Sequence, residues 1–99
     1  MAYNAKDLTK MKLGISSSAL DETIEFMIES VESEFHEVYK IKENDLMRQD
    51  IVDLISDYVV FKLNNNYSNM PRHIQARLYN LLFTLDLRWL YEHFANWKN

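Results

Sequence analysis

The chain has 99 residues, of which 47% are apolar and 26% charged, as is typical of a folded domain. It has 15 acidic and 11 basic residues, a formal charge of −4, which argues against nucleic-acid binding because phosphate contacts need excess Lys and Arg. It has no cysteine, which excludes disulfides and thiolate metal sites and fits a reducing cytosol. One glycine and one proline favour helices over a sheet, whose turns need both. We therefore predict one all-α domain over residues 1–99, a small bundle of about four helices: one short, two medium and a long C-terminal one.

The N-terminus lacks an apolar run behind basic residues, so no secretory signal is expected. Nowhere does the sequence approach 18 uncharged apolar residues, so no membrane span is expected either.

The first half of the chain predicts two helices. A short one covers Ala5–Leu13, and Gly14 follows it where a left-handed cap residue belongs. Ser18 is the expected N-cap of the second, which runs from Ala19 to about Lys40. Its expected core positions are Leu20, Ile24, Met27, Ile28, Val31, Phe35, Val38 and Tyr39. The opposite arc holds Asp21, Glu22, Glu25, Glu29, Glu32 and Glu37, with Phe26 among them. This arc is either a solvated face or a surface that repels DNA or meets a basic partner, with Phe26 as a possible interface contact.

A third helix is predicted from about Asp45 to Leu63, with Asn44 as its cap. Its candidate core residues are Ile51, Leu54, Ile55, Tyr58, Val59 and Phe61. A second acidic stripe consists of Asp50, Asp53 and Asp57. Residues 64–70 form a polar loop, and Pro71 fits the first position of the last helix, where its missing N–H costs nothing.

The last helix carries two apolar stripes. The first suits an ordinary core and comprises Ile74, Leu78, Leu81, Leu82, Leu85 and Trp89. The second, mostly 90° or more away, comprises Tyr79, Phe83, Leu87, Leu90, Phe94 and Trp97. Leaving six such side chains in water forgoes about 9–18 kcal/mol, comparable to the whole stability of a domain. A partner, foremost a second copy of this chain, is therefore expected to cover this stripe, unless part of it folds back under the N-terminal helix. A helix of about 25 residues would exceed the width of the domain, so it either breaks near residues 86–88 or projects.

No catalytic chemistry is evident in the sequence. The histidines at positions 36, 73 and 93 have no metal-ligand spacing, and the four glutamates from Glu22 to Glu32 face outward, unlike those of a di-iron bundle. A phosphate-binding glycine loop and a nucleophile motif are both absent. We expect no enzyme activity and no catalytic, cofactor-binding or metal-binding residues. A helix-turn-helix regulator is a weaker alternative, because Arg72, Arg77 and Arg88 are scattered among aromatic residues.

The order of elements resembles a family of phage proteins. Asp7-Leu8, Leu13-Gly14-Ile15 and then Asp21-Glu22 with Ile24, Ile28 and Val31 resemble the opening of the tailed-phage head–tail connector (adaptor, or head-completion) proteins. Asp50-Ile51, Leu54-Ile55 and Tyr58-Val59, followed by an asparagine-rich turn and Met70-Pro71, resemble the middle of that family. The similarity covers roughly residues 5–90, and the aromatic end from Leu90 to Trp97 departs from it.

The resemblance implies a structural virion protein of a bacteriophage, located at the head–tail interface and in the host cytoplasm during assembly. Such a protein forms a homo-oligomeric ring, often a dodecamer, that joins the portal protein to the tail or next head-completion protein. DNA passes through its lumen during genome ejection without sequence-specific binding. The alternative is a small helical binding module or dimeric regulator, antitoxin-like or DNA-binding.

A ring needs two different patches on each subunit. The proposed interface residues are Phe26, Tyr79, Phe83, Leu87, Leu90, Phe94 and Trp97. The complement of the second stripe is expected either around Phe26 or at Leu46 and Val60.

Overall fold

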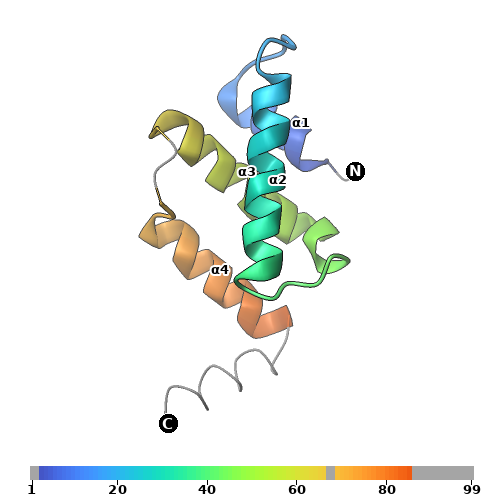
Figure 1. The fold of residues 1–99 in the computed structure, drawn as a ribbon, viewed down its shortest axis with the longest axis vertical. Coiled ribbons are helices and arrows are strands. Elements are labelled where there is room, and N and C mark those ends of the chain that lie inside the picture. Colours follow the sequence, from blue (N-terminus) through green and yellow to red (C-terminus); the bar gives the residue numbers. More distant parts are fainter. Residues whose placement is uncertain (1–2, 67–68, 86–99) are drawn as a thin grey trace.

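The structure is a computed structural model that describes residues 3–66 and 69–85. Its elements are α1 (Ala5–Leu13), α2 (Asp21–Glu37), the short 3₁₀ helix η1 (Asp45–Met47), α3 (Gln49–Asn64) and α4 (Arg72–Leu85) (Figure 1). Across these residues there is no strand. The predicted all-α fold of four helices is thus confirmed.

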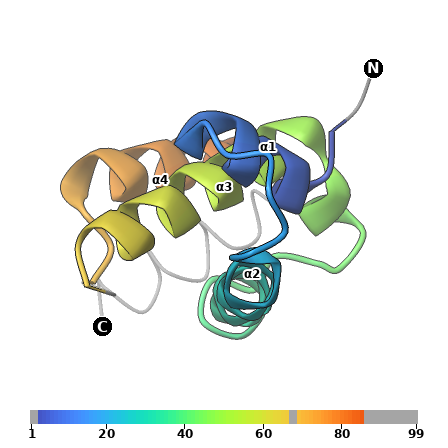
Figure 2. The same cartoon turned by 90° about the horizontal axis from the view of Figure 1, so that it is seen from above.

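Helix α3 lies at the centre of the domain. It packs against α1, α2 and α4 and also against η1, and Figure 2 shows α2 and α4 on different sides of it. Helix α1 packs against α3 and α2. The central position of α3 explains why its apolar residues extend around much of the helix, whereas α2 and α4 each bury a single stripe.

One continuous core joins the helices. Its buried apolar residues are Ala5, Ile24, Met27, Ile28, Val31, Phe35, Ile41, Leu46, Ile51, Val52, Leu54, Ile55, Tyr58, Val59, Ile74, Leu78 and Leu82. Two predicted core residues of α2, Leu20 and Val38, are instead exposed, by 43% and 61%. Both lie just outside the ends of the helix, so the helical period does not place them on its buried stripe. Phe61, also predicted to be buried, is half-buried.

Helix α1 has the predicted bounds and the predicted end. The side chain of Asn4 accepts a hydrogen bond from the Asp7 N–H at 2.8 Å, which caps the first turn. Gly14 has φ +71°, the left-handed conformation that favours glycine. The N–H groups of Gly14 and Ile15 return to the carbonyls of Met11 and Lys10, so they satisfy the last turn of the helix.

The predicted starts of the next two helices were wrong. Helix α2 begins at Asp21 rather than Ala19, and Leu20 occupies its N-cap position. The expected cap, the hydroxyl of Ser18, is not used; instead the backbone carbonyl of Ser18 accepts a hydrogen bond from the Asp21 N–H. Asn44 makes no side-chain cap, and the expected helix from Asp45 is divided. The division falls at Arg48, whose ψ of 141° is extended.

The start of α4 differs by one residue from the prediction. Pro71 precedes the helix instead of occupying its first position, and its carbonyl accepts a hydrogen bond from the Gln75 N–H at 3.0 Å. The missing N–H of proline still costs nothing here, because no helical partner is needed before the first turn. The proposed break near residues 86–88 lies outside the described residues.

Candidate interaction surfaces

Helix α4 presents two different faces. Ile74, Leu78 and Leu82 are at most 2% exposed and close the core, as predicted for the first stripe. On the other face, Tyr79 is 44% and Phe83 55% exposed. We call these two residues and the helix surface that carries them the outer face of α4.

Tyr79 is held in place from two sides. Its ring meets the edge of Tyr39 at a centroid distance of 6.4 Å, and its hydroxyl accepts a hydrogen bond from Gln75 at 3.1 Å. Phe83 makes no comparable ring contact with the described residues, so this benzyl group is the largest apolar part of the outer face. Four further predicted interface residues, Leu87, Leu90, Phe94 and Trp97, lie outside the part of the chain that the structure describes.

The phenylalanine of α2 lies on the outward face of the helix, as the helical period predicted. Phe26 is 70% exposed, in the middle of the outward face of the helix, whereas Met27 and Ile28 beside it are buried. By contrast, Leu46 was wrongly suggested as an exposed interface residue: it is 8% exposed and belongs to the core, because η1 turns it toward α2 and α3. Val60, suggested with it, is half-buried.

The acidic stripe of α3 is an ion-pair cluster rather than an open charged surface. Lys12 of α1 reaches Asp53 at 2.7 Å and Asp57 at 2.8 Å. From the other side, Arg77 of α4 donates to Asp53 at 3.0 Å and also pairs with Asp57. Lys12 donates in addition to the fully buried Ser56 hydroxyl, at 2.6 Å. Two carboxylates on α3 thus tie α1 and α4 to the central helix.

This cluster changes the acid–base properties of Asp57. Burial would raise the pKa of Asp57, but hydrogen bonds from Arg77 and Lys12 outweigh burial and hold the pKa below its ordinary value. The same bonds raise the pKa of Arg77. Since the Arg77 guanidinium is engaged with two carboxylates, it is a poor candidate for a phosphate contact, which weakens the DNA-binding alternative.

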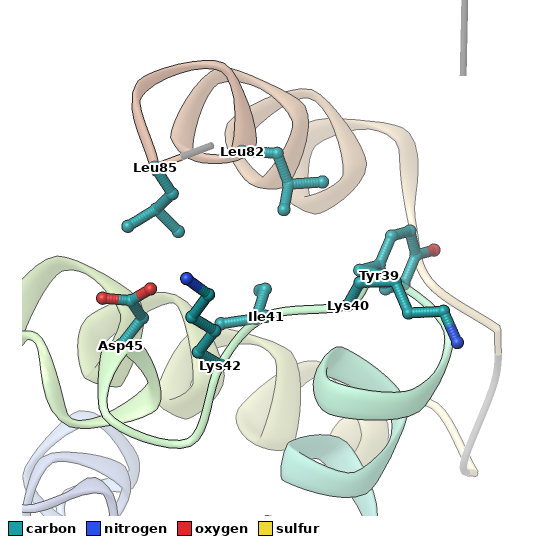
Figure 3. Close-up of a pocket in the computed structure, with 7 residues that line it drawn as sticks. All are labelled: Tyr39, Lys40, Ile41, Lys42, Asp45, Leu82 and Leu85. Carbon is teal, nitrogen blue, oxygen red and sulfur yellow. The ribbon is translucent and has the colours of Figure 1, made fainter. Parts of the chain in front are cut away.

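A small cavity lies between the α2–η1 linker and the end of α4 (Figure 3). It encloses about 80 Å³ and is lined by Tyr39, Lys40, Ile41, Lys42, Asp45, Leu82 and Leu85. This volume is well below the 300–1,000 Å³ of ordinary ligand pockets and corresponds to two or three waters at about 30 Å³ each. This cavity could not be predicted from the sequence, since it forms where residues far apart in the chain converge. Nothing in its lining suggests catalytic chemistry.

The two histidines that the structure describes have structural contacts. His36 Nδ1 lies 2.8 Å from the Ile41 carbonyl, and the His73 ring meets the edge of Phe61. Within residues 3–66 and 69–85, no group of three His, Asp or Glu side chains is placed to hold a metal ion. In the same residues, no helix is both long and apolar enough to cross a membrane.

Protein-family models, curated proteins and solved structures gave no match to this chain. Any inference about function therefore rests on the fold class and on the geometry of the described surfaces.

Proposed function

We propose that the chain is the subunit of a head–tail connector ring of a tailed phage. The ring would join the portal to the tail or the next head-completion protein and let DNA pass through its lumen. The order of elements supports this proposal: a short helix closed by Gly14, a long acidic helix, a third helix, an asparagine-rich turn and a last helix introduced by Pro71. The proposal assigns no catalysis, cofactor or metal.

The observation that carries the proposal is the outer face of α4. Its inner face already closes the core through Leu78 and Leu82, so Tyr79 and Phe83 are not needed there. Covering the exposed part of two aromatic side chains gains roughly 1–3 kcal/mol, at about 1.5–3 kcal/mol for a fully buried one. An interface built around aromatic anchors of this kind is typical of subunit and portal contacts.

Assembly with a portal protein tests the proposal. Native mass spectrometry of the chain, with and without the portal encoded in the same genome, should show a ring of many copies on the portal. Some connectors assemble only on their partner, so the portal sample decides. A chain that never joins the portal contradicts the proposal, and a closed two-fold dimer that ignores the portal favours the regulator alternative.

A matched pair of variants tests the outer face itself. Phe83→Asp should abolish assembly while helical circular dichroism persists, because the residue is 55% exposed in the free subunit. Asn80→Asp introduces the same charge at a neighbouring exposed position of α4 and should assemble normally. If both variants assemble, or if Phe83→Asp unfolds the subunit, the outer face is not the contact that we propose.

A further inference from the structure

The charges of this chain are strongly segregated along its length. Residues 21–57 hold twelve acidic and three basic residues, a formal charge of −9, while residues 58–85 hold three basic residues and no acidic one, a charge of +3. The first stretch includes α2, and the second covers the end of α3 and all of α4. The two ends of this charge gradient are also on different sides of the fold, as Figure 2 shows for α2 and α4.

The outward side of α2 is acidic and largely uncompensated. Near the start of the helix, Asp21 and Glu25 are paired with lysines of α1. Within the described part of the chain, no ion pair is found for Glu22, which lies between these two residues, or for Glu29 and Glu37 farther along; all three are exposed. We call these three glutamates, together with Phe26 and Glu32, the acidic face. Beside it is an open hollow of about 360 Å³, lined by Glu29, Glu32, Ser33, His36, Glu37, Glu43 and Leu46.

Two further features place carboxylates of the acidic face in unfavourable surroundings. Burial and the charge of Glu29 both raise the pKa of Glu32, so neighbouring carboxylates repel one another here. Glu37 is the last residue of α2, where the helix dipole disfavours a negative charge. Phe26 lies in the middle of these charges and is 70% exposed. A surface that breaks local rules in this way is where a binding function is expected.

The opposite charge lies on the end of α3 and the start of α4, where Lys62 and Arg72 are found; we call these two residues the basic corner. Arg72 is exposed in the first turn of α4, where the helix dipole disfavours a cation and where that turn itself contains no acidic residue. The ammonium of Lys62 lies 4.7 Å from the centre of the Tyr58 ring. Arg77 does not contribute, because Asp53 and Asp57 neutralise it.

We propose that the acidic face of one subunit docks on the basic corner of a second copy of this chain, with Phe26 buried between them. The chain carries both members of the charge pair at separate places on its surface, so a contact between them joins two different patches and can link subunits head to tail. The inference rests on the proposed function for the closing of such a row into a ring. It leaves the outer face of α4 for the portal, and so assigns the two surfaces different partners.

Charge exchange between two variants tests this contact. The face variant Glu22→Lys/Glu29→Lys/Glu37→Lys and the corner variant Lys62→Glu/Arg72→Glu should each self-associate at least tenfold more weakly than the unaltered chain in sedimentation equilibrium at low salt. An equimolar mixture should recover association, because each reversed surface then meets an opposite one. A single chain with all five substitutions should recover it as well.

Salt and a charge-reversal control at other positions separate a specific contact from general charge effects. Association of the unaltered chain should weaken between about 0.02 M and 0.3 M salt, as the Debye length falls from about 20 Å to about 5 Å. Asp7→Lys/Asp45→Lys also adds positive charge, but at two positions outside the acidic face, with no side-chain ion pair within the described residues, and should associate normally. Circular dichroism of every variant should match the unaltered chain.

The possible results distinguish failure of this inference from failure of the proposed function. A monomeric unaltered chain at low salt, a mixture that does not recover association, or a face variant that loses portal binding but not self-association overturns the inference. If the mixture pairs but the unaltered chain never joins a portal, the proposed function fails and the inference stands. If the unaltered chain and the face variant load the portal equally, the inference fails and the proposed function stands.

Discussion

Replacing Asp57 by Asn tests whether the ion-pair cluster fixes α4 to the rest of the domain. Asp57 accepts from Lys12 at 2.8 Å and from Arg77, and its side chain is 30% exposed. Two partly screened ion pairs of about 0.2–1 kcal/mol each, with charge-assisted hydrogen bonds, give a loss of about 1–2 kcal/mol. With a denaturant slope of about 1.5 kcal/mol per molar urea, the unfolding midpoint should fall by about 1 M at pH 7.

The pH dependence of this loss decides whether charge is the cause. The pKa of Asp57 is lower in the folded chain than its ordinary value of 3.8. Its contribution is therefore fully present above that value and is lost as pH falls through the folded pKa. The difference between Asp57→Asn and the unaltered chain should shrink as pH falls below 3.8 and through the folded pKa, since Asp57 is then protonated and both side chains are neutral. Asp7→Asn, exposed and without an ion pair in the described residues, is the control. A loss that stays the same from pH 7 down to acid unfolding, or no loss at any pH, would refute the reasoning.

Three further predictions concern the core and the backbone. Leu78→Ala should lower the free energy of unfolding by about 3 kcal/mol, but Phe83→Ala by less than about 1.5 kcal/mol, because Leu78 is fully buried and Phe83 is 55% exposed; urea titrations compare them. Gly14→Ala should cost about 1 kcal/mol in the same assay, purely from the positive φ, since no atom lies within 4 Å of an added Cβ. Burial and the charge of Glu34 raise the pKa of Tyr58 to about 12, so the chain should lose stability as pH rises from about 10 to 12. Tyr58→Phe should reduce that loss, and the part that remains belongs to Tyr39, whose pKa is also raised by burial; thermal melts across this range measure the difference, and an unchanged alkaline loss would point to another group.

The sequence predicts this fold well where the signal is local. The helical period placed Ile24, Val31 and Leu78 in the core, and Gly14 marked the end of α1, because both signals depend on a few neighbouring residues. The division at Arg48 had no such signal: this stretch contains neither glycine nor proline, and the turn follows from how Leu46 packs under α2 and α3. Tertiary packing overrides local preference in such a segment.

Long-range pairing explains what the sequence could not predict about the surfaces. Asp53 and Asp57 look like an open acidic stripe until Lys12, some forty residues earlier in the chain, is placed beside them. The exposure of Phe26 and Phe83, in contrast, follows from the helical period, because each lies opposite the buried stripe of its own helix. The charged clusters needed the three-dimensional structure, whereas the exposed aromatic residues did not.

The central place of α3 has a consequence for how the chain is made. Helices α1 and α2 contact each other, but both also pack on α3, which follows them in the sequence, so neither can bury its whole apolar stripe until residue 64 has left the ribosome. With synthesis at about 5–20 residues per second, the first forty residues wait seconds without their partner. Acidic side chains on the outside of α2 keep this waiting segment soluble by charge repulsion. The order of the helices therefore implies that α1 and α2 complete their packing late and at nearly the same time, once α3 has been made.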